Sequence, residues 1–412
     1  MKWEKLNRKK VTKIIEDALA INASHTKSGL MGIPTTYLDK DEFYPDASFL
    51  NNAPYMRSLI SNPNHIGCHT LSKQSPSIYE GTLAIERELI HLCAEEIFGA
   101  KKNSIDGYVA SGGTEANIEA LWIFRNYFNK EYNAKSNQIA VVYSEDSHYA
   151  ITKGCDLLQL QEIIVPVEFE SRQINEVELQ KRIAEAKSNG VKYFIVILNM
   201  ATRMYGSIEL INPVVEVLDK ENVLYKIHLD ASFGGFIYPF TNPKSIHNFK
   251  NTKISSIAID AQNMLQTPYG TGVFLIRKGY MQYVSNRQAQ HIPGKDYTIC
   301  GSRSGSNAIV IWMLLVSYGS EGWIEKMKET IQRTDFLCKG LDKMGVSYFR
   351  NPYMNIVAIK ANSIPTELGQ KYGLVADTTE HTPSWWKIVV MDHVNYDLLN
   401  RFLDEYKGVS IA

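Results

Sequence analysis

Short runs of β-branched and other apolar residues alternate with helical stretches between about residues 105 and 277, and this alternation limits the possible folds more than any other feature. Parallel strands that are buried on both faces have this near-continuous apolar character. The sequence therefore predicts an α/β fold with a mostly parallel sheet, in which ligands bind beyond the carboxyl ends of the strands. The predicted strands cover residues 107–110, 139–144, 163–167, 192–199, 224–230, 255–260 and 272–277.

The two ends of the 412-residue chain differ from this central pattern. Residues 1–65 are expected to form an N-terminal segment with a role in dimer contacts or as a lid, and residues 66–305 the large domain. Residues 306–412 are expected to form a small C-terminal α+β domain. Its predicted elements are helices over 307–318, 321–344 and roughly 394–407, and strands over 354–361 and 385–391.

Charge and cysteine content exclude several classes of protein. Lys and Arg total 44 and Asp and Glu also total 44, and this neutral balance argues against nucleic acid as a partner. No run of 18 apolar residues is present, so we expect no membrane span. The five cysteines are scattered and never form C-x-x-C. That pattern favours a reducing cytoplasm, and neither a disulfide framework nor a zinc site.

A glycine-rich turn follows the first predicted strand and opens a helix: Ser111-Gly112-Gly113-Thr114. Free N–H groups at a helix N-terminus, with a hydroxyl beside them, bind anions, and glycines let the backbone approach a phosphate closely. The turn matches neither a Walker loop nor a dinucleotide fingerprint. The alternative interpretation is a simple turn in which Thr114 caps the helix.

Two further polar residues come at or just after strand ends. His148 follows strand 139–144, where its imidazole could stack on a flat heterocycle or could instead be an ordinary surface or core histidine. Asp230 closes strand 224–230. A buried aspartate is costly unless a cation pairs with it, and a protonated pyridine nitrogen is such a cation. The alternative for Asp230 is a helix N-cap.

Two more segments complete the set. Asp260-Ala261-Gln262-Asn263-Met264 precedes PYGTG and strand 272–277. Gly301-Ser302-Arg303-Ser304-Gly305 surrounds an arginine with small residues, which suits a second anion contact or a subunit interface.

Taken in order, SGGTEAN, His148, HLDA, the D-x-x-x-M segment with PYGTG, GSRSG and IVVMDHV resemble the pyridoxal-phosphate-dependent group II decarboxylases of fold type I. That family includes aromatic amino-acid, histidine, glutamate, aspartate and tyrosine decarboxylases, and sphingosine-phosphate lyase is a relative. The match begins near residue 65 and reaches the C-terminus. It implies an aspartate-aminotransferase-like large domain, pyridoxal 5′-phosphate (PLP) as cofactor, a homodimer, and an L-amino acid converted to CO₂ and an amine.

The resemblance also implies roles for individual residues. The turn would hold the phosphate, His148 would stack on the pyridine ring, and Asp230 would keep the ring nitrogen protonated. A loop near residues 283–300 would cover the substrate, through Tyr283, His291 and Tyr297. The implied cofactor-binding residues are Ser111, Gly112, Gly113, Thr114, His148, Thr202, Asp230, Ala231, Gln262 and Asn263.

The chain departs from the family at its D-x-H-K segment, where the lysine forms the Schiff base with the cofactor. Asn263 occupies the lysine position and Gln262 the histidine position. An amide nitrogen is not a nucleophile, so Asn263 cannot replace the lysine, whereas Gln262 can still donate to a phosphate. Turnover should therefore fall by orders of magnitude. Lys295, on the expected loop, is the lysine that the sequence offers as a substitute.

Several interpretations stay open at this stage. The chain is either a decarboxylase whose lysine has been replaced, a catalytically impaired pseudoenzyme that binds a pyridoxal species or a partner, or another PLP-dependent lyase or aminotransferase. The substrate is equally open. His65, His69 and Tyr79 either line the substrate pocket or have structural roles.

Overall fold

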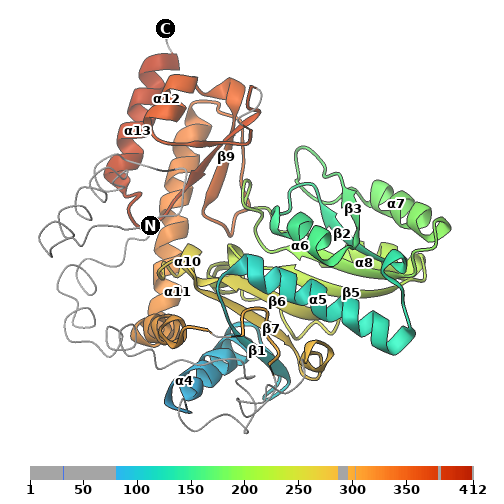
Figure 1. The fold of residues 1–412 in the computed structure, drawn as a ribbon. Coiled ribbons are helices and arrows are strands. Elements are labelled where there is room, and N and C mark those ends of the chain that lie inside the picture. Colours follow the sequence, from blue (N-terminus) through green and yellow to red (C-terminus); the bar gives the residue numbers. More distant parts are fainter. Residues whose placement is uncertain (1–30, 32–79, 286–295, 302, 379–381, 411–412) are drawn as a thin grey trace, which may run out of the picture.

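Two β-sheets joined by one long helix make up the computed structural model, which describes residue 31 and residues 80–285, 296–301, 303–378 and 382–410 (Figure 1). The larger sheet lies in the first part of these residues and the smaller one near the C-terminus. The predicted α/β class is confirmed. Residue 31 apart, segment 1–65 lies outside the described residues, as do His65, His69, Tyr79, His291 and Lys295, so the expectations for them are not tested.

The described residues form a seven-stranded sheet in the order β1-β7-β6-β5-β4-β2-β3. Within it only β7 is antiparallel to its neighbours, and the other described pairs run parallel. The carboxyl ends of the six remaining strands therefore share one edge. The strands span Ile105–Ala110 (β1), Ile139–Ser144 (β2), Gln161–Val165 (β3), Tyr193–Asn199 (β4), Leu224–Asp230 (β5), Ile254–Asp260 (β6) and Gly272–Arg277 (β7).

Helices cover both faces of this sheet, which explains the almost wholly apolar strands. Every residue of β4 is buried. Helices α5 and α6 pack on one face, and α4, α7, α8 and part of α11 pack on the other (Figure 1). The helices and helical turns of this half span Glu80–His91 (α4), Leu92–Ile97 (a π-helical turn), Gly113–Tyr132 (α5), Ser136–Gln138, Ala150–Leu158 (α6), Glu176–Ser188 (α7), Ile211–Lys220 (α8), Gly234–Phe236, Tyr238–Thr241 (α9), Ala261–Met264 (α10) and Met281–Val284.

Helix α11, Gly305–Lys343, joins the two halves. The two helices predicted over 307–318 and 321–344 are one helix interrupted at Gly319, where φ is 62° and ψ is 175°. Glycine adopts such a positive φ without steric cost. Leu314 packs in the core of the large sheet, whereas Leu341 packs in the core of the small one.

The smaller sheet is antiparallel, with the described strands in the order β10-β11-β9-β8. Helices α12 and α13 pack with it in a separate apolar core. Among the described residues, no helix is long and apolar enough to cross a bilayer. The elements span Tyr348–Phe349 (β8), Ile356–Lys360 (β9), Ala361–Ser363 (a 3₁₀ turn), Thr366–Lys371 (α12), Val375–Ala376 (β10), Trp385–Val389 (β11) and Tyr396–Ser410 (α13).

Candidate active site

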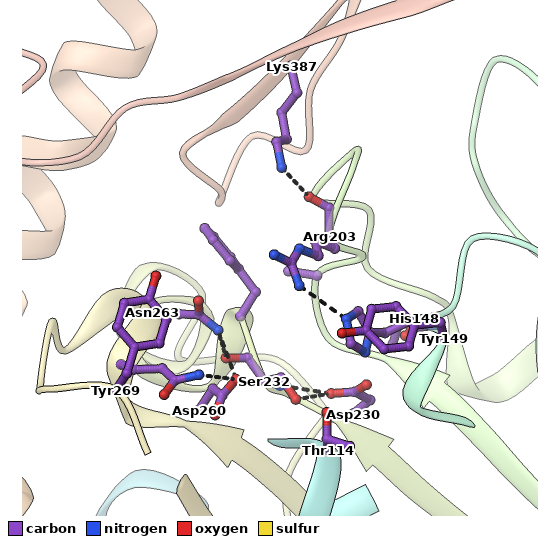
Figure 2. A pocket seen from close by; sticks show the side chains of 14 residues that line it. Thr114, His148, Tyr149, Arg203, Asp230, Ser232, Asp260, Asn263, Tyr269 and Lys387 are labelled. Atoms are coloured by element: carbon purple, nitrogen blue, oxygen red, sulfur yellow. Dashed lines mark hydrogen bonds between the residues drawn. The ribbon is translucent and has the colours of Figure 1, made fainter. Parts of the chain in front are cut away.

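A cavity of about 280 Å³ lies at the carboxyl edge of the large sheet, where the small domain approaches it (Figure 2). Five of the residues singled out in the sequence line it together: Thr114, His148, Asp230, Gln262 and Asn263. They come from the segments that follow β1, β2 and β6 and from the last residue of β5. The other lining residues are Tyr149, Asn199, Ala201, Arg203, Ser232, Phe233, Asp260, Tyr269 and Lys387.

The turn between β1 and α5 is packed so closely that it requires glycine. A Cβ atom on Gly113 would lie 2.3 Å from Ser232 Oγ, and one on Gly272 would lie 2.7 Å from Gly112 Cα. Of the N–H groups in the first turn of α5, that of Gly113 donates to Asp260 Oδ1 at 2.7 Å and that of Ala116 donates to the carbonyl of Gly112 at 3.2 Å. The N–H groups of Thr114 and Glu115, together with the Thr114 hydroxyl, can bind an anion.

Ser111 forms hydrogen bonds within the turn. Its N–H and its hydroxyl both donate to the Glu115 carboxylate, at 2.8 and 2.6 Å. Ser111 is thus held away from the cavity lining, and the same is true of Thr202 and Ala231. Thr202 is buried and its hydroxyl lies 2.7 Å from Ser207 Oγ. Ala231 is fully buried and its N–H donates to the carbonyl of Ala258 at 2.8 Å.

Asp230 presents a buried carboxylate to the cavity. Asn117 Nδ2 donates to one oxygen at 2.9 Å, and the N–H of Ser232 donates to the other at 3.0 Å. Only 4% of the residue is exposed, and within the part of the chain described here it forms no ion pair. A buried carboxylate of this kind is stabilised by a cationic ligand. The protonated nitrogen of a pyridine ring meets that requirement.

A chain of hydrogen bonds holds Asn117 in place. His228 Nε2 lies 2.7 Å from Asn117 Oδ1, and His228 Nδ1 lies 2.7 Å from Ser256 Oγ. Since the Asn117 amide nitrogen donates to Asp230, its oxygen must accept, so the proton of His228 lies on Nε2. Burial lowers the pKa of His228 to about 4, which keeps the ring neutral.

His148 lies partly buried at the cavity wall, beside Arg203. Arg203 Nη1 is 3.1 Å from His148 Nε2, and the N–H of Ala150 lies 3.2 Å from His148 Nδ1. Burial lowers the pKa of His148, and the cationic side chains of Arg203 and Lys153 add to that effect against the opposing charge of Asp230. The imidazole is therefore neutral at pH 7 and suited to stacking on an aromatic ring.

Asp260, Gln262 and Asn263 line the cavity at the carboxyl end of β6. The Asn263 side chain donates to the carbonyl of Ser232 at 2.9 Å and to Asp260 Oδ2 at 3.3 Å. Gln262 Oε1 accepts from the N–H of Gly270 at 2.8 Å. Burial raises the pKa of Asp260 to about 7, although the N–H of Gly113 donates to it at 2.7 Å.

Two residues that the sequence associated with the site lie elsewhere. The hydroxyl of Tyr283 donates to Glu131 near the C-terminal end of α5, whereas the cavity is at the other end of that 20-residue helix, roughly 30 Å away. Tyr283 therefore does not line the cavity of its own chain. Arg303 is paired through both terminal nitrogens with the Glu86 carboxylate, so it is not available as a second anion contact.

Sequence reasoning did not single out Arg203, Tyr269 or Lys387 as site residues. Lys387 lies in the middle of the buried strand β11, and its Nζ donates to the carbonyl of Arg203 at 3.2 Å. A lysine flanked on both sides by apolar residues, in Trp-Trp-Lys-Ile-Val, was the signal that could have identified it.

Comparison with known proteins agrees with this geometry. Residues 53–356 match the pyridoxal-dependent decarboxylase conserved domain. The chain belongs to this family. It is accordingly a PLP-dependent amino-acid decarboxylase by descent, of fold type I, and the predicted cofactor and reaction class are confirmed.

Individual relatives are similar over almost the whole chain. Tryptophan decarboxylase of Clostridium sporogenes is 46% identical over 398 residues, which cover 97% of this chain and 95% of that protein. The fold matches that of sphingosine-1-phosphate lyase from Burkholderia pseudomallei, with a TM-score of 0.79, 14% identity and coverage of 100% and 92%. It also matches L-methionine decarboxylase from Streptomyces, with a TM-score of 0.75, 19% identity and coverage of 97% and 95%.

Proposed function

We propose that this chain is a decarboxylase of aromatic L-amino acids, with tryptophan as the first substrate to test, and that Asn263 makes its turnover slow. The similarity to tryptophan decarboxylase carries the substrate class, because it extends over 97% of the chain at 46% identity. The cavity adds support, since Tyr149, Phe233 and Tyr269 supply aromatic surface to its lining. Aromatic rings pack favourably against one another.

The residues of the cavity fit PLP at three points. The N-terminus of α5 and Thr114 would bind the phosphate, His148 would stack on the ring, and Asp230 would hold a proton on the ring nitrogen. When bound, PLP accepts the electron pair that remains at Cα after CO₂ leaves. The hydrogen bonds from Asn117 and Ser232 keep the Asp230 carboxylate turned toward the cavity.

Asn263 removes one function from this site. An amide nitrogen cannot exchange covalently with the amine of a substrate, so loading of the amino acid and release of the product lose their catalyst. The binding residues are present, and the cost therefore falls on turnover more than on cofactor affinity. A binding protein without turnover is the second candidate function, and this same observation favours it.

Restoring the lysine tests the proposal. The Asn263→Lys variant, loaded with PLP, should release CO₂ and the corresponding amine from tryptophan at least 100-fold faster than the parent chain. Asn263→Gln, which keeps an amide, is the matched control and should stay slow. Tyrosine, phenylalanine, histidine and methionine complete the panel. Absence of CO₂ from every amino acid would sink the decarboxylase proposal, and a keto-acid product would point to an aminotransferase.

Assembly and location are separate proposals. We propose a cytoplasmic homodimer, because fold type I sites usually form between two subunits and the cysteine pattern suits a reducing compartment. Light scattering of the PLP-loaded protein measures the assembly. A monomer at micromolar concentration would contradict the dimer.

A further inference from the structure

We propose that Lys387 supplies the amine that position 263 lacks, by forming a covalent bond from its Nζ to the aldehyde carbon of PLP. The inference shares with the proposed function only the requirement that PLP binds in this cavity. It assigns a role to a residue of the small domain.

Strand geometry directs Lys387 toward the cavity. Side chains alternate between the two faces of a strand. Trp386 and Ile388 pack in the core of the small domain, whereas Val389 packs in the core of the large one. Lys387 shares its face with Val389 and enters the cavity from the side opposite Asp230 and Thr114 (Figure 2).

The surroundings of Lys387 leave its amine available for reaction. The residue is only 5% exposed, and the one hydrogen bond of its Nζ among the described residues goes to the carbonyl of Arg203. The described residues place no carboxylate within ion-pair distance of this nitrogen. Burial without an anionic partner destabilises the ammonium and so increases the fraction of neutral amine.

Electrostatics act in the same direction. Burial lowers the pKa of Lys387 to about 8, and the cationic Arg203 contributes to the shift. At pH 7 roughly a tenth of a lysine with that pKa is neutral, compared with far less than a hundredth for an ordinary lysine. Desolvated lysines of this kind are the ones that act as nucleophiles toward carbonyl groups. Lys387 is also the only lysine among the described residues that lines the cavity.

The proposed step balances without a further reagent. The lone pair of the neutral Nζ attacks the aldehyde carbon, and the two hydrogens of the amine leave with the aldehyde oxygen as one molecule of water. A C=N bond then joins Lys387 to the cofactor. The flexible four-carbon stem of lysine allows Nζ to move from the Arg203 carbonyl toward the cofactor.

Reductive trapping tests the assignment directly. The full-length chain is incubated with one equivalent of PLP, reduced with borohydride and digested, and each lysine is scored for the added mass by mass spectrometry. We expect Lys387 to carry at least tenfold more label than any other lysine. Pyridoxine 5′-phosphate, which has an alcohol in place of the aldehyde, should compete for the cavity and suppress this label.

Matched variants separate reaction from folding. Lys387→Arg keeps the positive charge and Lys387→Met keeps the chain length, and both should lose the label while still binding PLP in equilibrium dialysis. Lys371→Met, at an exposed lysine of the same domain, should label like the parent chain. In Asn263→Lys the label should move to the introduced lysine.

Each remaining outcome has a defined meaning. Principal labelling of another lysine, Lys295 included, or an even distribution over surface lysines overturns the inference, as does PLP binding without any label. CO₂ release by Asn263→Lys together with an unlabelled Lys387 in the parent sinks only the inference. A labelled Lys387 with no CO₂ release sinks only the proposed function, and failure to bind PLP sinks both.

Discussion

Asn117 Nδ2 donates a 2.9 Å hydrogen bond to Asp230 Oδ2, and this bond connects the first turns of α5 to the end of β5. The phosphate cradle and the carboxylate for the ring nitrogen are thereby fixed relative to each other. Since His228 donates to the other end of the same amide, the spacing is set by a buried chain of neutral groups.

Asn117→Leu should weaken both stability and cofactor binding. The substitution removes one buried hydrogen-bond partner from His228 and one from Asp230, at a cost of about 1–3 kcal/mol per group. We expect a lower midpoint in urea unfolding and about a tenfold rise in the Kd for PLP. Asn126→Leu on the same helix serves as control, since it removes a partly buried bond to the carbonyl of Tyr283 and two bonds from the neighbouring Arg125 side chain, all away from the cavity. An unchanged Kd in Asn117→Leu would contradict the positioning role.

Gly113→Ala should damage the turn even though alanine favours helices. The added methyl group would overlap Ser232 Oγ at 2.3 Å, so the segment that carries Asp230 must shift. Gly81→Ala is the comparison, because Gly81 lies in α4 with nothing within 4 Å of the new atom. We expect the Gly81 variant to gain about 0.5–1 kcal/mol of stability and the Gly113 variant to lose PLP binding. Equal behaviour of the two in PLP titration would rule out this explanation.

Breaking the pair of Glu86 and Arg303 should destabilise the chain strongly. Glu86 also accepts a hydrogen bond from the N–H of Val109 at 2.7 Å, and Arg303 donates one to the carbonyl of Val109 at 3.0 Å. The pair therefore supplies hydrogen-bond partners to the backbone of the edge strand β1. Glu86→Leu alone leaves a buried guanidinium and should cost about 3–5 kcal/mol in chemical unfolding. The double variant Glu86→Leu/Arg303→Met should recover part of that loss. Additive losses in the two single variants and the double variant would show that the residues do not act as a pair.

Asp260 should make the free chain less stable as the pH rises. Burial raises its pKa from 3.8 to about 7, so the folded chain holds a proton that the unfolded chain releases between about pH 4 and pH 7. The free energy of unfolding therefore falls through that window, by an amount on the order of a few kcal/mol. In urea titrations without PLP, the free energies of unfolding at pH 5 and pH 7.5 should differ less for Asp260→Asn than for the parent chain.

Burial raises the pKa of Glu209 to about 7 as well, so Glu209 also makes the free energy of unfolding fall as the pH rises. The free energy of unfolding of the variant Asp260→Asn/Glu209→Gln should accordingly depend less on pH than that of either single variant. Parallel pH profiles for the parent and the double variant would exclude both groups as the cause.

The strands of the large sheet were predictable because burial on both faces leaves each one as an unbroken apolar run. The observed limits differ from the predicted ones by two residues at most, as in β1 and β3. Five cavity residues were found for a related reason. In a parallel sheet, polar residues that come at or just after strand ends converge on one edge. Thr114, His148 and Asp230 could therefore be grouped without knowledge of their distances.

The remaining features depend on contacts that are distant in the sequence. Arg303 lies 217 residues from its partner Glu86, and nothing near Arg303 indicates that its charge is already neutralised. Lys387 reaches the cavity only because the small domain docks with one face of β11 toward the large one. Tyr283 lies away from the cavity of its own chain because the chain turns away after β7 and packs on the far end of α5.

The course of α11 determines how this protein can be divided and recombined. Trp323 and Met327 lie beyond the break at Gly319, yet they still pack in the core of the large sheet, and only from Phe336 onward does the helix pack in the small core. The border between the two cores therefore falls inside continuous helix, where no loop offers a junction. A chimera that exchanges the small domain must carry the whole of α11 with it, and transplanting the cofactor cavity means transplanting both halves.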